Sequence, residues 1–304
     1  MPMNTERTKN VLIVFFSVIA VSLGVLIFVT EGRYTLSAGQ EAAIMTILER
    51  DDIHLRGDAV PVRDFRPVRQ MEMRRYDYDF ESLAARFFGD EGFAKEINYP
   101  AYIFTHPDQN DGKSMTYLFW TNVITFAIPQ GISNEAFEAM LNDRAAELLA
   151  TQYIESLMGM PPNMQHYSTT ISYYGNWMVD FFTVYRSFLL NNDHIMAYVT
   201  PNGITKIEYS RVDYGGFVGD ARGIFPPNEA LMTLMNQMRR GGAEGTIVVN
   251  DMRLSYFLAE EGGQSVGVPA YVFAVYMGGN LRFNYVFNAH TNELLLFERS
   301  ERSP

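Results

Sequence analysis

The segment VFNAHTNELLLF, residues 286–297, decides which kind of fold the sequence predicts. Two apolar runs flank a short polar stretch around His290, which is either a turn between two strands or a metal-binding or catalytic cluster. Asn288 and Thr291 can bond to local backbone, and Asn292 tolerates the positive φ that a tight turn requires. These properties favour the turn, so we expect a β-hairpin at this position.

Upstream of this hairpin, short strands and turns recur in groups, and each group follows a helix. Apolar residues at helical spacing predict helices that begin near Ser37, at residue 80, at Ser133 and at Pro226. Helices followed by antiparallel strands are typical of an α+β fold, with helices on one face of antiparallel sheets. We expect two such units, residues 34–131 and 132–304, and the second contains two similar helix-and-strand repeats.

The N-terminal segment predicts a membrane anchor. Residues 11–30 carry no charge, and twenty helical residues span about 30 Å, the thickness of the hydrocarbon layer. A cleaved signal peptide is the alternative, but its apolar part is usually shorter. Arg7 and Lys9 precede the segment, so we expect residues 1–10 to form a cytoplasmic tail and residues 34–304 to lie outside the cell.

Small residues within this anchor suggest a helix-packing surface. Small side chains near one face of a membrane helix let another helix approach closely, although a lone anchor also tolerates them. The residues concerned are Ser17, Ala20 and Gly24.

The composition excludes several function classes. The chain of 304 residues has no cysteine, which removes disulfides, thiol nucleophiles and thiolate metal sites. A net charge of −11 without a basic stripe argues against nucleic-acid binding.

Local catalytic motifs are also absent from the sequence. The five histidines are widely separated, there is no H-E-x-x-H, and no serine lies in a G-x-S-x-G. The glycine-rich stretch YGGFVGDARG, residues 214–223, lacks the lysine and serine or threonine of a phosphate-binding loop, and we expect a linker there. The sequence therefore predicts no enzyme, no cofactor and no metal site.

Several short motifs together resemble the YycI-type regulatory proteins of Gram-positive bacteria, which belong to the YycH/YycI superfamily and contain PepSY-like units. The motifs lie in LSAGQEAAIMTILERDDIHLRGDAVP, FPPNEALMTLM, VNDMRLSYFL, VPAYVFAV and FNAHTNEL. Three positions depart from the family pattern, because Ser255 and Asn292 replace glycine and Tyr271 replaces tryptophan. The motifs assign a structural role to both matching and substituted positions. These are Glu229, Leu231, Leu254, Tyr256, Pro269, Tyr271, Asn288, Ala289, Thr291 and Asn292.

The resemblance implies a function without catalysis. Proteins of this family are single-pass membrane proteins that associate with a YycH-type partner and a sensor histidine kinase of the WalK (YycG) type. They tune a two-component system that governs cell-wall metabolism, through contacts made in the membrane. The alternative is a PepSY-like extracellular binding module that inhibits or chaperones a peptidase, and a cell-envelope hydrolase with a dispersed site is a third hypothesis.

Overall fold

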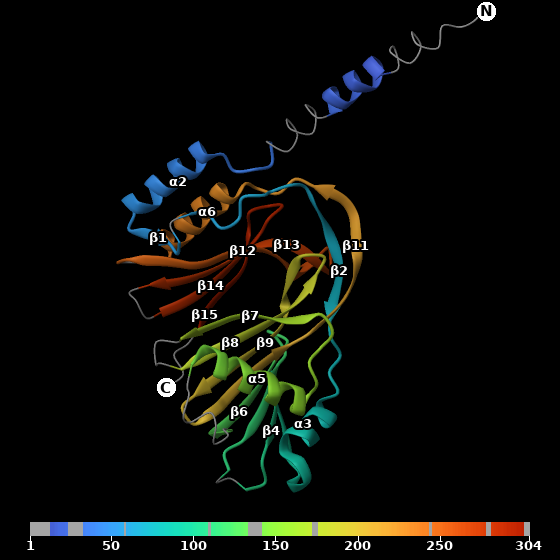
Figure 1. Ribbon diagram of the computed structural model, residues 1–304. Helices are drawn as coiled ribbons and strands as arrows, with labels where there is room; N and C mark the ends of the chain where they lie inside the picture. The colour runs from blue at the N-terminus through green and yellow to red at the C-terminus, as the bar shows by residue number, and fades with distance from the viewer. Residues whose placement is uncertain are drawn as a thin grey trace, which may run out of the picture.

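The protein forms one large sheet covered by two pairs of helices (Figure 1). The structure is a computed structural model that describes residues 13–23, 33–57, 59–108, 111–132, 142–171, 176–242, 245–277 and 281–300. The helices are α2 (Ala38–Arg50), α3 (Phe80–Phe88), the 3₁₀ turn η1 (Gly89–Glu91), α5 (Asp143–Leu157) and α6 (Pro227–Arg240). The strands are β1 (Ile53–Leu55), β2 (Val68–Arg75), β3 (Ala94–Asn98), β4 (Ala101–Thr105), β5 (Ser114–Leu118), β6 (Val123–Ile132), β7 (Met164–Ile171), β8 (Trp177–Tyr185), β9 (Phe188–Thr200), β10 (Gly203–Ser210), β11 (Val212–Arg222), β12 (Ile247–Glu261), β13 (Gln264–Met277), β14 (Leu281–Asn288) and β15 (Leu294–Ser300).

The sheet confirms the predicted α+β class. Its fifteen strands include the continuous order β11-β2-β13-β12-β9-β10-β6-β5-β4-β3. Among the described residues, parallel pairing is confined to β1 with β12 and to β9 with β12, and the remaining ladders are antiparallel. Antiparallel neighbours can be joined by short turns, which explains the closely spaced turn signals in the sequence.

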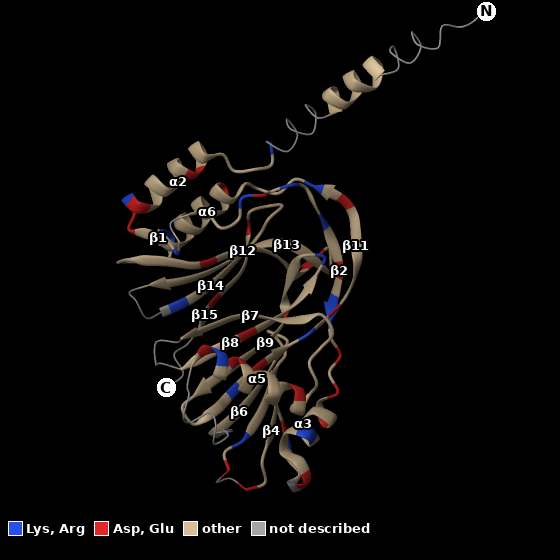
Figure 2. Cartoon of the chain, in the orientation of Figure 1, with Lys and Arg blue, Asp and Glu red and all other residues tan. Residues whose placement is uncertain are grey.

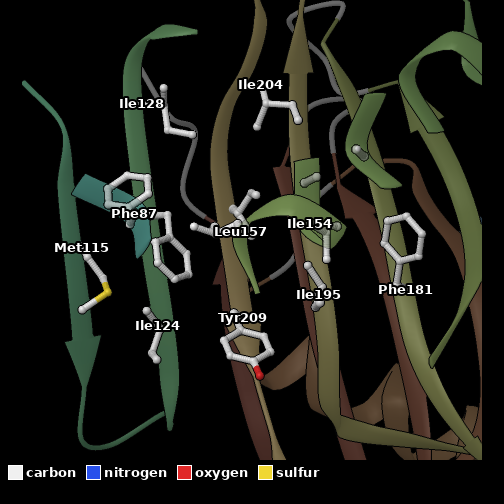
Figure 3. Packing of buried hydrophobic residues seen from close by; sticks show 14 of the residues in the cluster. Phe87, Met115, Ile124, Ile128, Ile154, Leu157, Phe181, Ile195, Ile204 and Tyr209 are labelled. Atoms are coloured by element: carbon white, nitrogen blue, oxygen red, sulfur yellow. The ribbon is translucent and has the colours of Figure 1, made fainter. Parts of the chain in front are cut away.

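Two hydrophobic cores lie between the helices and the sheet. The first core joins α3 and α5 to the strands from β4 to β10, and Figure 3 shows part of this packing. Figure 3 labels Phe87 of α3, Leu157 of α5, Ile124 of β6 and Ile195 of β9, which all belong to this core. The second core joins α2 and α6 to β1 and the strands β12, β13 and β14.

The first core contains residues from both sides of residue 131, for example Phe126 and Ile195. The expected division into one unit at 34–131 and another at 132–304 stays a prediction.

Three predicted helix ends agree with the structure. Ser37 caps α2, and its side chain and that of Gln40 form a reciprocal capping box. Gly89 follows the last residue of α3 with a φ of 68°, and α6 begins at Pro227. The fourth helix differs, because α5 begins at Asp143 after an Asn142 N-cap, whereas the expected cap Ser133 lies outside the described residues.

The linker expected at residues 214–223 is wrong, because this segment belongs to strand β11. β11 pairs with β2, and the two strands form the long ribbon at the right of Figure 1. The register of the pair shifts between Tyr214 and Phe217, where the two adjacent glycines lie. A Cβ atom on Gly215 would come within 2.6 Å of the Glu72 carboxylate, so glycine permits the close approach of the two strands.

The N-terminal helical segment, residues 13–23, projects away from the body of the protein (Figure 1). Within the described ranges, the structure contains no helix that is both long and apolar enough to cross a membrane. The expected span covers residues 11–30, and its residues 11, 12 and 24–30 lie outside the described part of the chain. The membrane span therefore stays a prediction.

Candidate functional site

The helices nearest the N-terminal segment form the candidate site, which we call the α2–α6 layer. It consists of α2, β1, α6 and the closing turn, residues 288–293, and it covers one face of β12, β13 and β14 (Figure 1). α2 packs on α6, and its buried side chains Ile44 and Leu48 belong to the same core as Leu231 of α6. Glu41 of α2 accepts hydrogen bonds at 2.8 Å from the Arg63 guanidinium and at 3.1 Å from the Val60 amide. These bonds fix α2 to the segment that follows β1.

The closing turn has the conformation that its sequence predicts. The Asn292 amide donates to the Asn288 carbonyl at 2.7 Å, and the His290 amide donates to the Asn288 side-chain oxygen at 2.8 Å. Asn292 has a φ of 58°, as expected for the asparagine that replaces glycine. The alternative of a metal site finds no support, because no group of three or more potential ligands occurs among the described residues.

Hydrogen bonds tie this turn to α6 and to the segment that leads into it. The Asn292 side-chain amide donates to the Thr233 hydroxyl at 2.7 Å, which joins the turn to the body of the helix. The Phe225 amide donates to the Ala289 carbonyl at 2.8 Å. The Tyr271 hydroxyl, on β13, donates to the Phe225 carbonyl at 2.7 Å. The start of α6 is therefore fixed to β13 and to the turn at once.

Most of the residues singled out by the family motifs meet in this layer. Leu231, Tyr271 and Ala289 are buried in the second core, and Leu254 packs against it. Pro269 accepts a hydrogen bond at 2.8 Å from the Ala289 amide through its carbonyl. These contacts bring positions that are far apart in the sequence close together in the fold.

The other three motif residues lie elsewhere or at the surface. Tyr256 belongs to a separate cluster, where its hydroxyl donates to the Arg69 carbonyl at 2.6 Å. Glu229 is exposed in the first turn of α6, where its charge complements the helix dipole. Thr291 is also exposed, and its hydroxyl donates to Glu293 at 3.0 Å.

Two substitutions of Asn292 separate the contribution of its side-chain hydrogen bond to stability from that of its backbone conformation. Replacing Asn292 with alanine should lower the free energy of unfolding by about 2 kcal/mol, because a hydrogen bond is lost and an alanine adopts positive φ. Replacing Asn292 with glycine removes the same hydrogen bond without the steric penalty, so we expect about 1 kcal/mol or less. Urea denaturation of both variants tests this, and equal losses would show that the backbone conformation contributes nothing.

A polar contact that the sequence did not indicate lies at the opposite end of the layer, where α2 and α6 both end. The Asp51 carboxylate pairs with the Arg239 guanidinium across the two helix ends. Asp52 accepts hydrogen bonds from Thr246 at 2.7 Å and from His54 at 3.1 Å, and these bonds lower the pKa of Asp52. A depression of about 180 Å³ lies beside them. The residues next to Asp51 and Asp52 do not indicate these contacts, because the partners Arg239 and Thr246 lie far along the chain.

The first core holds a second polar contact that the sequence did not reveal. The Asp193 side chain is fully buried, and its Oδ1 lies 2.8 Å from Nε of Arg211. Burial raises the pKa of Asp193 to about 6, and the Arg211 guanidinium opposes that rise. Arg211 also stacks on the Tyr76 ring, with the guanidinium carbon 5.2 Å from the ring centre. This pair lies outside the α2–α6 layer and has a structural role.

The N-terminal helical segment carries the remaining predicted site residues. Every residue of 13–23 is exposed and none is charged, as the uniform tan colour of this helix in Figure 2 shows. Ser17 and Ala20 are three residues apart in the helix and therefore lie on neighbouring positions of one face. Gly24 lies outside the described residues.

Comparisons with known proteins leave the family open. No model of a protein family matches the chain, and no curated protein matches it. One similar solved structure is that of an uncharacterized protein from Eubacterium rectale, with a TM-score of 0.47, 12% identity, and coverage of 82% of this chain and 92% of that one. Another is a luciferin-regenerating enzyme, with a TM-score of 0.14, 8% identity, and coverage of 75% and 80%. Likenesses this distant carry no argument about function.

Proposed function

We propose that this chain is a membrane-anchored regulator that acts outside the cell, by protein–protein contact, on a sensor histidine kinase. In this proposal residues 11–30 cross the membrane once, the tail 1–10 is cytoplasmic, and the body of the chain is extracellular. Its partners are a kinase of the WalK (YycG) type and a YycH-type protein, and the regulated process is cell-wall metabolism. The proposal assigns no enzymatic activity and no cofactor to the chain.

The observation that carries the proposal is the uncovered apolar helix at residues 13–23. Eight large apolar side chains of this segment are exposed to solvent, and the body of the protein covers none of them (Figure 1). A contiguous apolar surface of this kind marks a membrane-binding or protein-binding element. In a membrane, Ser17, Ala20 and Gly24 would allow a second helix to approach closely.

The α2–α6 layer connects this anchor with the rest of the protein. α2 is the first helix after the anchor, it packs on α6, and α6 is bonded to the closing turn. A shift of the anchor against the body therefore acts first on this layer. A regulator can change a kinase only by contacting its two signalling states with different affinity. The anchor makes that contact, and the body sets its orientation.

A helix exchange tests the proposal. The full-length protein is purified by affinity from detergent-solubilised membranes, beside a twin in which residues 11–30 are replaced by an unrelated apolar helix. We expect the native helix to recover a histidine kinase and the exchanged helix to lose it. Recovery of an extracellular peptidase by both proteins would overturn the proposal in favour of the PepSY-like binding module.

A second pair of variants locates the contact within the anchor. Leucine at all three of the small positions, Ser17, Ala20 and Gly24, should abolish recovery of the kinase, because larger side chains separate the two helices. Matched leucine substitutions in the same helix should leave recovery unchanged, and these replace Val14, Val18 and Val21. Equal effects of the two sets would show that the small residues do not form the contact.

A further inference from the structure

Strand β3 forms one edge of the sheet, and its side chains are exposed on both faces. β3 pairs with β4, and among the described strands it has no second neighbour. All five of its residues are exposed. The backbone groups on its outer side therefore form a row that another strand could pair with.

Two of the usual devices that protect an edge strand, a β-bulge and a proline, are missing here. The ladder between β3 and β4 runs without a register shift from Ala94 to Asn98, and β3 contains no proline. A lysine on an edge strand often prevents pairing with another strand, but the side chain of Lys95 is bound by neighbouring residues of its own chain. Its ammonium group bonds to Glu81 at 2.5 Å and lies 5.5 Å from the centre of the Tyr102 ring. The edge is therefore open to pairing.

Large apolar side chains lie on and beside this edge. Ile97 is 68% exposed although it sits in a paired strand, and Tyr99 and Trp120 are 72% and 65% exposed. The Tyr99 ring contacts the rings of Trp120 and Phe119, with centroid distances of 5.7 and 6.0 Å. Tyr99, Phe119 and Trp120 form an aromatic patch next to β3, and such patches are typical of protein interfaces.

We infer that β3 pairs antiparallel with β3 of a second copy of this chain, with the two-fold axis at Ile97. A two-fold axis perpendicular to the sheet keeps each side chain on its own face, so such a pairing is centred on a single residue. A centre at Lys95 or Glu96 would place like charges directly opposite each other, which is destabilising. A centre at Ile97 places Ile97 against itself, Glu96 against Asn98, and Lys95 against Tyr99.

The net charge of the chain predicts that dimerisation depends on the salt concentration. The chain has a net charge of −11, so two copies repel each other at long range. β3 itself carries one lysine and one glutamate, and the aromatic patch carries no charge. Added salt screens the long-range repulsion and leaves the apolar contacts intact, so dimerisation should strengthen as the salt concentration rises.

Single cysteines test the register directly, because the chain has no cysteine of its own. Cα atoms of directly opposite residues in an antiparallel pair are about 4.5–5.5 Å apart, within the range in which a disulfide forms. The full-length Ile97→Cys variant should therefore form disulfide-linked dimers under mild oxidation. Glu96→Cys should not, because its sulfur atoms lie on diagonal positions about 7–8 Å apart. An equimolar mixture of Glu96→Cys and Asn98→Cys should link again.

A matched control and a disruptive variant make the result decisive. Ile171, 57% exposed on the edge strand β7, has a similar setting, so Ile171→Cys reports random collision. Cross-linking of the Glu96 or Ile171 variant as fully as the Ile97 variant would overturn the inference. Ile97→Lys places two like charges on the axis and should lower the dimer fraction at least tenfold in sedimentation velocity. An Ile97→Lys variant that is folded, as judged by circular dichroism, and still dimerises would also overturn the inference.

Discussion

Replacing Asp193 with alanine is expected to lower the free energy of unfolding by about 3–5 kcal/mol at pH 7. The substitution leaves Arg211 of the first core without the carboxylate that lies 2.8 Å from its guanidinium. Removing one partner of a buried pair leaves an uncompensated charge in a poorly solvated place, which is more harmful than removing both. Chemical denaturation followed by tryptophan fluorescence measures the loss.

A surface pair of the same two residue types provides the control. Asp213 lies 3.3 Å from Arg74, and both side chains are exposed. Replacing Asp213 with alanine should therefore change the free energy of unfolding by less than about 1 kcal/mol. Losses of similar size for Asp193 and Asp213 would show that burial does not decide the strength of these pairs.

The same variant also carries a pH signature. Burial raises the pKa of Asp193 from its ordinary value of 3.8 to about 6, so the folded protein retains a proton here that the unfolded chain has released. The stability that this group contributes is largest below pH 4 and decreases as the pH rises through 6, and the loss expected at pH 7 is what the contact with Arg211 still contributes after the carboxylate has ionised. The alanine variant lacks this dependence. The difference in the free energy of unfolding between wild type and variant should therefore decrease as the pH rises from 4 to 6. A gap that widens over this window would mean that the pKa of Asp193 is lowered.

Local signals in the sequence predicted the helix ends and the closing turn. Ser37, Gly89 and Pro227 act within three or four residues of the helix end that they define, so their chemistry is visible in a single window. The turn around Asn292 is local for the same reason. The antiparallel class followed from the turns that join neighbouring strands.

Features that depend on pairing across the sheet could not be predicted. The glycines of β11 indicated a linker, whereas Gly215 lies against the Glu72 side chain of β2, a strand about 140 residues earlier in the chain. Asp193 and Arg211 lie on the two sides of a hairpin, and nothing in their flanking residues distinguishes them from solvated charges. The Asp51–Arg239 contact is also non-local, because it depends on the packing of α2 against α6.

The crossing of β2 and β13 is the second place where we expect a large effect. Gly267 of β13 is paired with Met71 of β2, and the Met71 and Met73 side chains are buried. A Cβ atom on Gly267 would lie 2.2 Å from the Met73 sulfur and 3.2 Å from Cβ of Met71. Gly267→Ala should therefore lower the free energy of unfolding by about 3 kcal/mol, because an overfilled core forces β2 away from β13. Gly216→Ala is the control, since a Cβ atom there meets no atom within 4 Å.

A double-mutant cycle shows whether the clash with Met73 is the cause. Met73→Ala alone creates a cavity and should lower the free energy of unfolding by about 2–5 kcal/mol. In the double variant the methyl group introduced at position 267 occupies part of that cavity, so the loss of the double variant should fall short of the sum of the two single losses by at least about 1 kcal/mol. Additive losses would mean that the alanine at 267 strains the backbone rather than the Met73 side chain. In that case the glycine is required by the crossing of the strands and not by the side chain packed against it.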